Sequence, residues 1–174
     1  MKLAKSINRL GTETAFEVLA KAKKLEAQGK EIVHLEIGEP DFETPIHIKE
    51  AAKKALDDNF THYVPSPGLM EVREVIAENQ SEVHNKIISP ENVVFTPGAK
   101  PIMFFTIMAL IEPGDEVIYP NPGFPIYESM INYVGGKAIP MELKEERDFN
   151  ADVDLIEESI TDKTKLIILN SPNN

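Results

Sequence analysis

From residue 92 to the last residue, short apolar segments alternate with helical segments, and proline and glycine separate them. The segments predicted as strands are NVVFT (92–96), EVIYP (116–120), KAIPMEL (137–143) and KLIILN (165–170). Helices are predicted between the strands, over 101–111, 125–134 and 151–160. This alternation is typical of an α/β fold, in which a mainly parallel sheet has helices on both faces. The fully apolar KLIILN is typical of a central strand in such a sheet.

The first ninety residues are predicted to be mostly helical. Apolar residues recur every three or four positions over 13–28, which indicates an amphipathic helix. Thr44 and Pro45 are suited to the start of a second helix that runs to about residue 58, and a third helix is predicted over 69–84. The segment EIVHLEIG (31–38) is predicted to be a short strand. Arg73, in the third helix, is expected to form a structural ion pair.

The composition excludes several classes of function. The 174 residues are 42% apolar and 27% charged, which is ordinary for a globular protein. The 29 acidic and 18 basic residues give a net charge of −11, which disfavours nucleic acids and anionic membranes as partners. Cysteine is absent, so disulfides, thiolate metal sites and cysteine nucleophiles are excluded. No signal peptide or membrane-spanning segment is recognised, and we expect a cytoplasmic protein.

Ligands of parallel α/β folds bind at the carboxyl ends of the strands. Four loops follow predicted strands and are therefore candidates: EPDF, TPGAK, YPNPGFP and NSPNN. In TPGAK, Gly98 and Ala99 allow backbone N–H groups to approach an anion at a helix N-terminus, and Lys100 adds positive charge. The plain alternative is a strand-to-helix turn that needs glycine for its geometry.

The other loops also have two interpretations each. Phe124 is placed to stack on a planar ring, or else it packs with Tyr127 in the core. The asparagines of NSPNN offer hydrogen bonds to a ligand, or else they serve the turn itself. The carboxylate pair Glu39 and Asp41 suggests acid–base chemistry or a metal, but a role as turn and capping residues is preferred. The acidic stretch 142–148 is interpreted as a solvated loop. The spacing of the four histidines predicts no metal site.

Taken in order, five motifs of this sequence resemble the first half of a fold-type I, pyridoxal-phosphate-dependent aminotransferase of class I/II, the aspartate-aminotransferase-like group. The motifs are IGEPDFETP, THYVPSPG, TPGAK, YPNPGFPIY and NSPNN. The resemblance extends over essentially the whole chain and favours the ligand-binding interpretations of TPGAK, Phe124 and NSPNN. It implies that residues 1–44 form an N-terminal arm and small-domain segment. It further implies that residues 45–174 form the N-terminal part of a three-layer α/β/α domain that binds the cofactor.

The resemblance also implies roles for single residues. Gly98, Ala99 and Lys100 match the turn that holds the phosphate of pyridoxal 5′-phosphate. Phe124 matches the aromatic residue that stacks on the pyridine ring. Asn174 matches the asparagine that bonds the 3′ oxygen of the cofactor and helps to hold the substrate carboxylate, which Gly38 meets with its backbone. Tyr63 matches a tyrosine that reaches the phosphate of the neighbouring subunit, so a homodimer is expected.

The implied function is amino-group transfer between an L-amino acid and a 2-oxo acid, in amino-acid metabolism. The family's Schiff-base lysine matches no lysine of this sequence, so the 174 residues alone are expected to be inactive. One alternative is therefore a truncated or split-enzyme chain that acts only as a binding or assembly module, with a possible separate C-terminal half as its partner. A weaker alternative is a pyridoxal-phosphate-dependent C–S lyase or decarboxylase. The motifs do not identify the amino acid.

Overall fold

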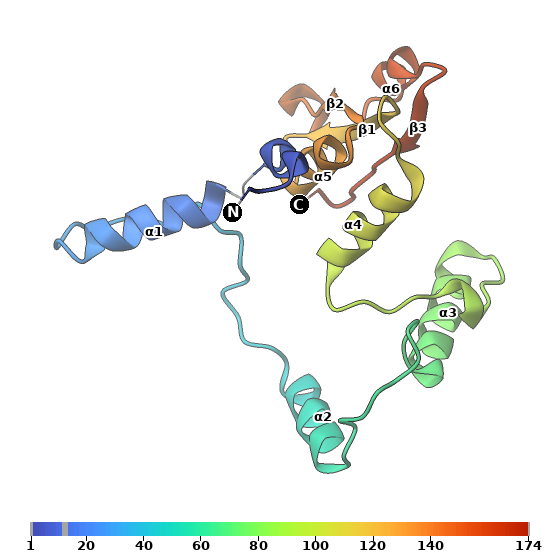
Figure 1. The fold of residues 1–174 in the computed structure, drawn as a ribbon. Helices are drawn as coiled ribbons and strands as arrows, with labels where there is room; N and C mark the ends of the chain where they lie inside the picture. The colour runs from blue at the N-terminus through green and yellow to red at the C-terminus, as the bar shows by residue number, and fades with distance from the viewer. Residues whose placement is uncertain (1, 12–13, 174) are drawn as a thin grey trace. The chain divides into compact units, whose positions relative to one another are not determined.

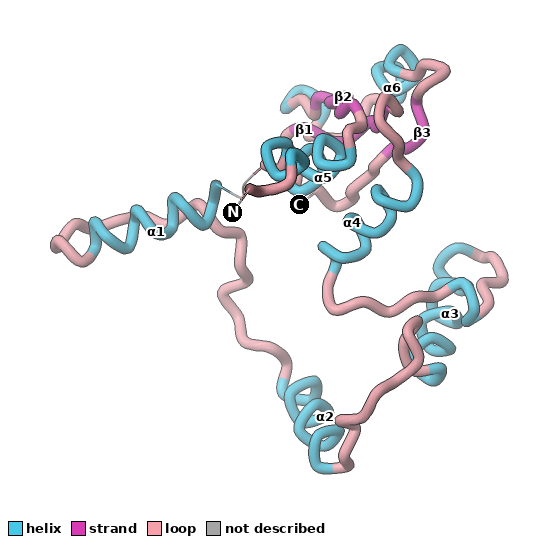
Figure 2. Tube along the Cα trace, viewed as in Figure 1, coloured by secondary structure: helices cyan, strands magenta, loops and turns pink. Residues whose placement is uncertain are grey.

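The computed structural model of the chain describes residues 2–11 and 14–173. The helices are α1 Thr14–Glu26, α2 Ile46–Asp57, α3 Met70–His84, α4 Ala99–Leu110, α5 Ile126–Val134 and α6 Val153–Ser159. The strands are β1 Glu116–Asn121, β2 Lys137–Glu142 and β3 Thr164–Ile167, and short 3-10 helices cover Lys5–Arg9, Pro90–Asn92 and Glu145–Arg147. Figure 1 labels the α-helices and the strands, and Figure 2 distinguishes helices, strands and loops by colour.

The described chain forms two compact units. One consists of Gly38–Pro97, and the other of the described parts of Met1–Ile37 and Gly98–Asn174. The division expected from the resemblance, between residues 44 and 45, concerns the complete family fold and stays a prediction. In the described residues, no helix is both long and apolar enough to cross a membrane.

The larger unit contains a parallel sheet with the strand order β2-β1-β3. Helix α5 connects β1 to β2, and α6 connects β2 to β3, so each connection returns the chain to the same end of the sheet. The predicted α/β fold with a mainly parallel sheet is thereby confirmed. The central strand is β1, however, and β3 has a strand neighbour on one side only within the described residues. The expectation that KLIILN is central is not met in this sheet.

Alternate side chains of β1 pack into two cores on opposite faces of the sheet, as the period of a strand requires. Val117 and Tyr119 pack with apolar residues of α4 and α5, including the fully buried Ile131. Ile118 packs on the opposite face with Met141 and with Ile156 of α6. Helices therefore cover both faces of β1, which accounts for its continuous apolar sequence.

Two predicted strands, 31–38 and 92–96, are not strands in the described structure. A strand exists only where a second strand accepts and donates its backbone hydrogen bonds. In the second segment, the backbone N–H of Phe95 donates to the carbonyl oxygen of Pro67, 2.8 Å away in a loop. Both segments have the apolar composition of a strand but no strand partner among the described residues.

The smaller unit contains α2 and α3, and a buried arginine fastens α3 to the segment that follows it. Arg73 donates from Nε to the carbonyl oxygen of Val93 (2.9 Å) and from a terminal nitrogen to that of Pro90 (2.7 Å). The prediction of an ion pair at Arg73 was therefore wrong, because the guanidinium bonds backbone carbonyl groups instead. A guanidinium has several donors and can bond backbone carbonyl groups at two positions at once. The sequence does not distinguish this role from an ion pair.

Candidate functional site

The loops after β1 and β3 meet at the carboxyl edge of the sheet. The N–H of Ile168 donates to the carbonyl oxygen of Ile118 at 2.8 Å, which extends the pairing of these strands beyond the end of β3. Further along, the side-chain amide of Asn173 donates to the carbonyl oxygen of Pro122 at 3.3 Å. The sequence predicts that loops after strands converge on one edge, and the structure brings these two together.

Gly98 forms the junction between the TPGAK loop and α4. Its φ of 93° and ψ of 174° lie in a region that glycine adopts without strain and other residues avoid. A Cβ at this position would meet no described atom within 4 Å, so the described residues leave space beside the turn. The first residues of the 12-residue helix, Ala99 and Lys100, follow directly. The turn therefore combines open space, a helix N-terminus and a cationic side chain, and each of these favours an anion.

Lys100 and Phe124 are close in space although 24 positions separate them in the sequence. The Nζ atom of Lys100 lies 5.6 Å from the centroid of the Phe124 ring, within the distance of a cation–π contact. The α4 N-terminus and the loop after β1 thus meet at one place. The TPGAK loop is therefore a third candidate loop at the carboxyl edge, beside the loops after β1 and β3.

The two aromatic residues of this loop differ in their burial. Tyr127 is buried and belongs to the core that α4 and α5 share. Phe124 is half-buried and packs against the same core. Its ring meets that of Tyr127 edge to face, with centroids 6.0 Å apart and an interplanar angle of 88°. Burial raises the pKa of Tyr127, so this phenol stays neutral beneath the loop. Tyr127 is therefore a core residue that supports the Phe124 ring.

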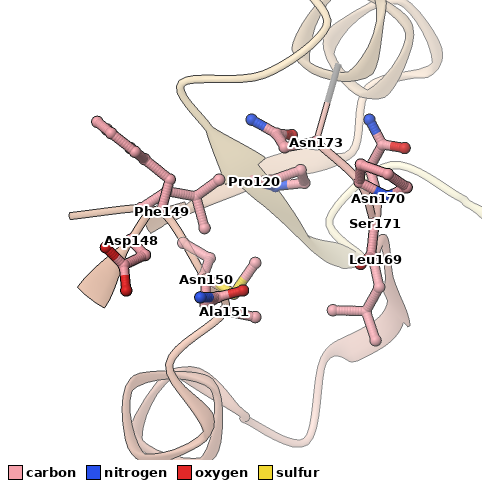
Figure 3. A pocket seen from close by; sticks show the side chains of 12 residues that line it. Pro120, Asp148, Phe149, Asn150, Ala151, Leu169, Asn170, Ser171 and Asn173 are labelled. Atoms are coloured by element: carbon pink, nitrogen blue, oxygen red, sulfur yellow. The ribbon is translucent and has the colours of Figure 1, made fainter. Parts of the chain in front are cut away.

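A pocket of about 610 Å³ opens at the same edge of the sheet (Figure 3). Its walls come from the ends of β1 and β2, from the loop after β3 and from the loop after β2. The residues that line it are Pro120, Met141, Leu143, Asp148, Phe149, Asn150, Ala151, Leu169, Asn170, Ser171, Pro172 and Asn173. The polar groups of the pocket are thus mainly amides and a hydroxyl, which can donate as well as accept.

Sequence reasoning missed the contribution of residues 148–151 to this pocket. Asp148 and Phe149 have φ values of 51° and 55°, and this left-handed pair turns the chain back over the sheet edge. The acidic composition of 142–148 indicated only a solvated loop. The signal that could have found the segment is its position, because it follows the predicted strand 137–143, as the other candidate loops follow theirs.

Three predicted site residues lie outside the described part of the larger unit. Gly38 and Tyr63 belong to the smaller unit, where Tyr63 is fully exposed. Asn174 lies outside the described residues. The roles of these three residues stay predictions.

Comparison with known proteins supports the same interpretation of the motifs. The family model described as aminotransferase class I and II matches residues 30–174, which is most of the chain. The chain belongs to the class I and II aminotransferases. All four candidate loops named from the sequence lie within the matched residues, and so do the positions of the proposed cofactor contacts.

Individual aminotransferases are similar along the whole chain. The chain is 38% identical to a probable aspartate/prephenate aminotransferase of Aquifex aeolicus and 37% identical to an aspartate aminotransferase of Bacillus subtilis. These matches cover 99% and 100% of the chain and 44% of each relative. The chain therefore spans less than half the length of the curated relatives it matches.

Solved aminotransferase structures are similar in fold as well. An alanine aminotransferase from Pyrococcus furiosus has a TM-score of 0.92 and 34% identity, over 99% of this chain and 44% of that one. An aspartate aminotransferase from Thermus thermophilus, solved with maleate, has a TM-score of 0.91 and 37% identity, over 100% of this chain and 46% of that one. The described fold is thus that of one part of an aminotransferase.

Proposed function

We propose that the protein transfers an amino group between an L-amino acid and a 2-oxo acid with pyridoxal 5′-phosphate as cofactor, and that this chain supplies part of the cofactor site. The observation that carries the proposal is the meeting of Lys100 with Phe124 beside the N-terminus of α4. An anion-binding turn and an aromatic face at one place are what a phosphorylated planar ring requires. Membership of the aminotransferase family supports the reaction class.

The residues present fit the two ends of this cofactor. The open space beside Gly98, the start of α4 and the Lys100 ammonium suit a phosphate group. The half-buried ring of Phe124 suits the face of a pyridine ring, and its support by Tyr127 fixes its orientation. When bound, the cofactor supplies an electron-withdrawing ring that stabilises negative charge at the α-carbon of the amino acid.

This chain's own residues act by binding and orientation. The α4 turn holds the phosphate and so fixes the position of the ring along the sheet edge. Phe124 fixes the plane of the ring, because an aromatic pair loses contact when the two rings tilt. For Asn174 we propose a hydrogen bond to the 3′ oxygen of the cofactor and a part in holding the substrate carboxylate, and for Gly38 a backbone contact to that carboxylate.

We further propose that the active site is completed by a second subunit. Tyr63 is the residue that supports this, since its side chain is fully exposed in the described chain and its phenol can donate to a phosphate. In the homodimer, Tyr63 of each subunit reaches the phosphate bound by the other. A Tyr63→Phe subunit paired with a subunit impaired at Lys100 tests this, because one of the two sites in that heterodimer is then intact.

Cofactor binding is tested on the full chain with pyridoxamine 5′-phosphate and pyridoxamine, measured by calorimetry. These probes have no aldehyde and form no imine with surface lysines, so the comparison isolates the phosphate. We expect the phosphorylated probe to bind roughly tenfold tighter or more, as expected of charge-assisted hydrogen bonds to an anion. Lys100→Gln should remove most of this preference for the phosphorylated probe. Phe124→Ala should weaken the binding of both probes.

The matched controls for this binding experiment lie away from the site. Lys163→Gln makes the same charge change just before the amino end of β3, and Phe16→Ala removes an exposed phenylalanine of α1. Both variants should bind like the unaltered chain. Equal affinity for the two probes, or an equal loss in Lys163→Gln and Lys100→Gln, would contradict the proposed phosphate site.

The reaction is tested by following the amino nitrogen. With a ¹⁵N-labelled amino acid and 2-oxoglutarate, an aminotransferase moves the label to glutamate and releases the matching 2-oxo acid. A lyase releases labelled ammonia instead, and a decarboxylase releases carbon dioxide. The similar proteins are named for several substrates, including aspartate, prephenate and alanine, so a panel of amino acids is required.

The 174 residues by themselves should bind the phosphorylated probe and give no turnover, because the resemblance assigns the Schiff-base lysine to no residue of this sequence. Turnover is therefore expected when the remainder of the aminotransferase fold is present. Cofactor binding without turnover under that condition would favour the alternative of a binding or assembly module.

A further inference from the structure

A histidine joins the end of α1 to the extended segment that follows it. The Nε2 atom of His34 lies 2.8 Å from a carboxylate oxygen of Glu26, the last residue of α1. The Nδ1 atom of the same ring lies 2.6 Å from a carboxylate oxygen of Glu36. The ring therefore spans two carboxylates that belong to different segments, with the turn at Gly29 between them.

Each of these contacts requires a proton on the ring nitrogen that makes it. A carboxylate only accepts hydrogen bonds, whereas a neutral imidazole has one N–H and one lone pair. With a neutral His34, one carboxylate oxygen would face the lone pair, and that contact would be lost. Only the imidazolium form donates to Glu26 and Glu36 together.

We propose that Glu26, His34 and Glu36 form a pH-sensitive clip that holds the end of α1 to segment 31–37 while His34 is protonated and opens at Glu26 when that proton is lost. The three side chains do not form a metal-binding group, because each ring nitrogen faces a carboxylate oxygen directly. The clip is a local device of the N-terminal region and stands independently of the proposed cofactor site.

The Glu26 contact is the one that opens because of its exposure and its position on the helix. The Glu26 side chain is 42% exposed and water can replace its partner, whereas that of Glu36 is 9% exposed. Glu26 is also a negative charge at a helix C-terminus, which the helix dipole disfavours. The His34 cation compensates that charge, so its loss destabilises the last turn of α1.

The electrostatics of the three groups act in the same direction. Hydrogen bonds to Glu26 and then to Glu36 raise the pKa of His34 above its ordinary 6.5. The hydrogen bond from His34 lowers the pKa of Glu36 below its ordinary 4.5. Glu26 on α1 and Glu36 on the segment itself are the charged groups that act on His34 in the described structure. The clip is closed while His34 is protonated and both glutamates are ionised, and the stability it contributes is lost as pH rises through the pKa of His34.

The first test is the titration of His34 by NMR in the full chain. We expect His34 to titrate above pH 6.5, and the Glu26→Gln variant to titrate lower than the unaltered chain. The control is Glu31→Gln, which makes the same charge change at an exposed position three residues from His34 and outside the clip. A His34 pKa at or below 6.5, or an equal shift in Glu26→Gln and Glu31→Gln, would overturn the proposal.

The second test is hydrogen exchange at the end of α1, corrected for the intrinsic effect of pH. The N–H of Gly29 donates to the carbonyl oxygen of Glu26 at 2.8 Å, so its protection reports the last turn. Raising the pH through the His34 pKa should reduce protection about two- to fivefold, as expected for an exposed charge at a helix terminus. The Glu26→Gln variant should show no loss of protection across this pH range. The Glu31→Gln variant should show the same loss as the unaltered chain. Unchanged protection across the titration in the unaltered chain would show that no clip opens.

Discussion

Gly123 shows how tightly the backbone folds just before Phe124. A Cβ at this position would overlap the carbonyl oxygen of Pro120, at the end of β1. The backbone oxygen has no rotamer into which it can move, so any side chain at residue 123 would displace the loop. The position of the Phe124 ring beside Lys100 therefore depends on the absence of a side chain at the preceding residue.

The Gly123→Ala substitution is expected to destabilise the protein by about 1–3 kcal/mol, the usual cost of forcing an atom into filled space. It should also weaken the binding of pyridoxamine 5′-phosphate, because Phe124 moves with the loop. Chemical denaturation measures the first effect and calorimetry the second. The matched control is Gly38→Ala, whose Cβ would meet no described atom within 4 Å and whose stability should change little. Equal stability of the two variants would show that the loop accommodates a side chain.

At the scale of elements, one buried carboxylate ties together the amino ends of the three strands. Glu116 begins β1, and its side chain is 8% exposed. It accepts from the ammonium of Lys137, at the start of β2, at 2.9 Å. It also accepts from the hydroxyl of Thr161, in the turn before β3, at 2.7 Å. The hydrogen bond from Lys137 is the main reason that the pKa of Glu116 lies below its ordinary 4.5.

This clamp predicts a pH-dependent effect of the Glu116→Gln substitution. A carboxylate with a lowered pKa stabilises the fold above pH 4.5, and that contribution is lost as pH falls through its folded pKa. Glu116→Gln should therefore be less stable than the unaltered chain at neutral pH, and the difference should shrink in acid. Urea denaturation at several pH values measures this. Glu142→Gln changes the same charge at the opposite end of β2 and serves as control. A difference that is the same at all pH values would contradict the clamp.

At the scale of the whole molecule, the sheet edge at β3 and the segment just after it expose apolar side chains. Ile167 at the end of β3 is 38% exposed, and Leu169, two residues beyond it, is 65% exposed. In the described residues, β3 has a neighbouring strand on one side only. An exposed edge with apolar side chains pairs readily with another chain. We therefore expect the 174-residue chain to self-associate when it is studied alone.

Sedimentation velocity of the full chain over a range of concentrations tests this expectation. Leu169→Lys places a charge at the edge and should shift the chain toward the monomer, as charged side chains do on natural edge strands. Val83→Lys places the same charge on an exposed apolar position of α3 and should leave association unchanged. A single monomeric species that melts cooperatively without any substitution would contradict the prediction.

Most helices and the strands of the sheet could be predicted because their signals are local. The helix expected over 69–84 is α3, and the strand expected over 116–120 is β1 with one further residue. The predictions of strands at 31–38 and 92–96 were wrong, because their signals are not sufficient on their own. Their composition suits a strand, but a strand also needs a partner at a distant point of the chain, which no local pattern reveals.

Some features of the candidate site could likewise be predicted from the sequence, and others could not. The sequence by itself determined the motifs, and hence the family and the residues suited to an anion and a planar ring. Only the tertiary structure decided that Lys100 lies over Phe124, that residues 148–151 line the pocket, and that His34 joins Glu26 to Glu36. The physical reason is that residue type and spacing fix local conformation and chemistry. Contacts between distant segments depend on how sheet and helices pack, which no single segment encodes.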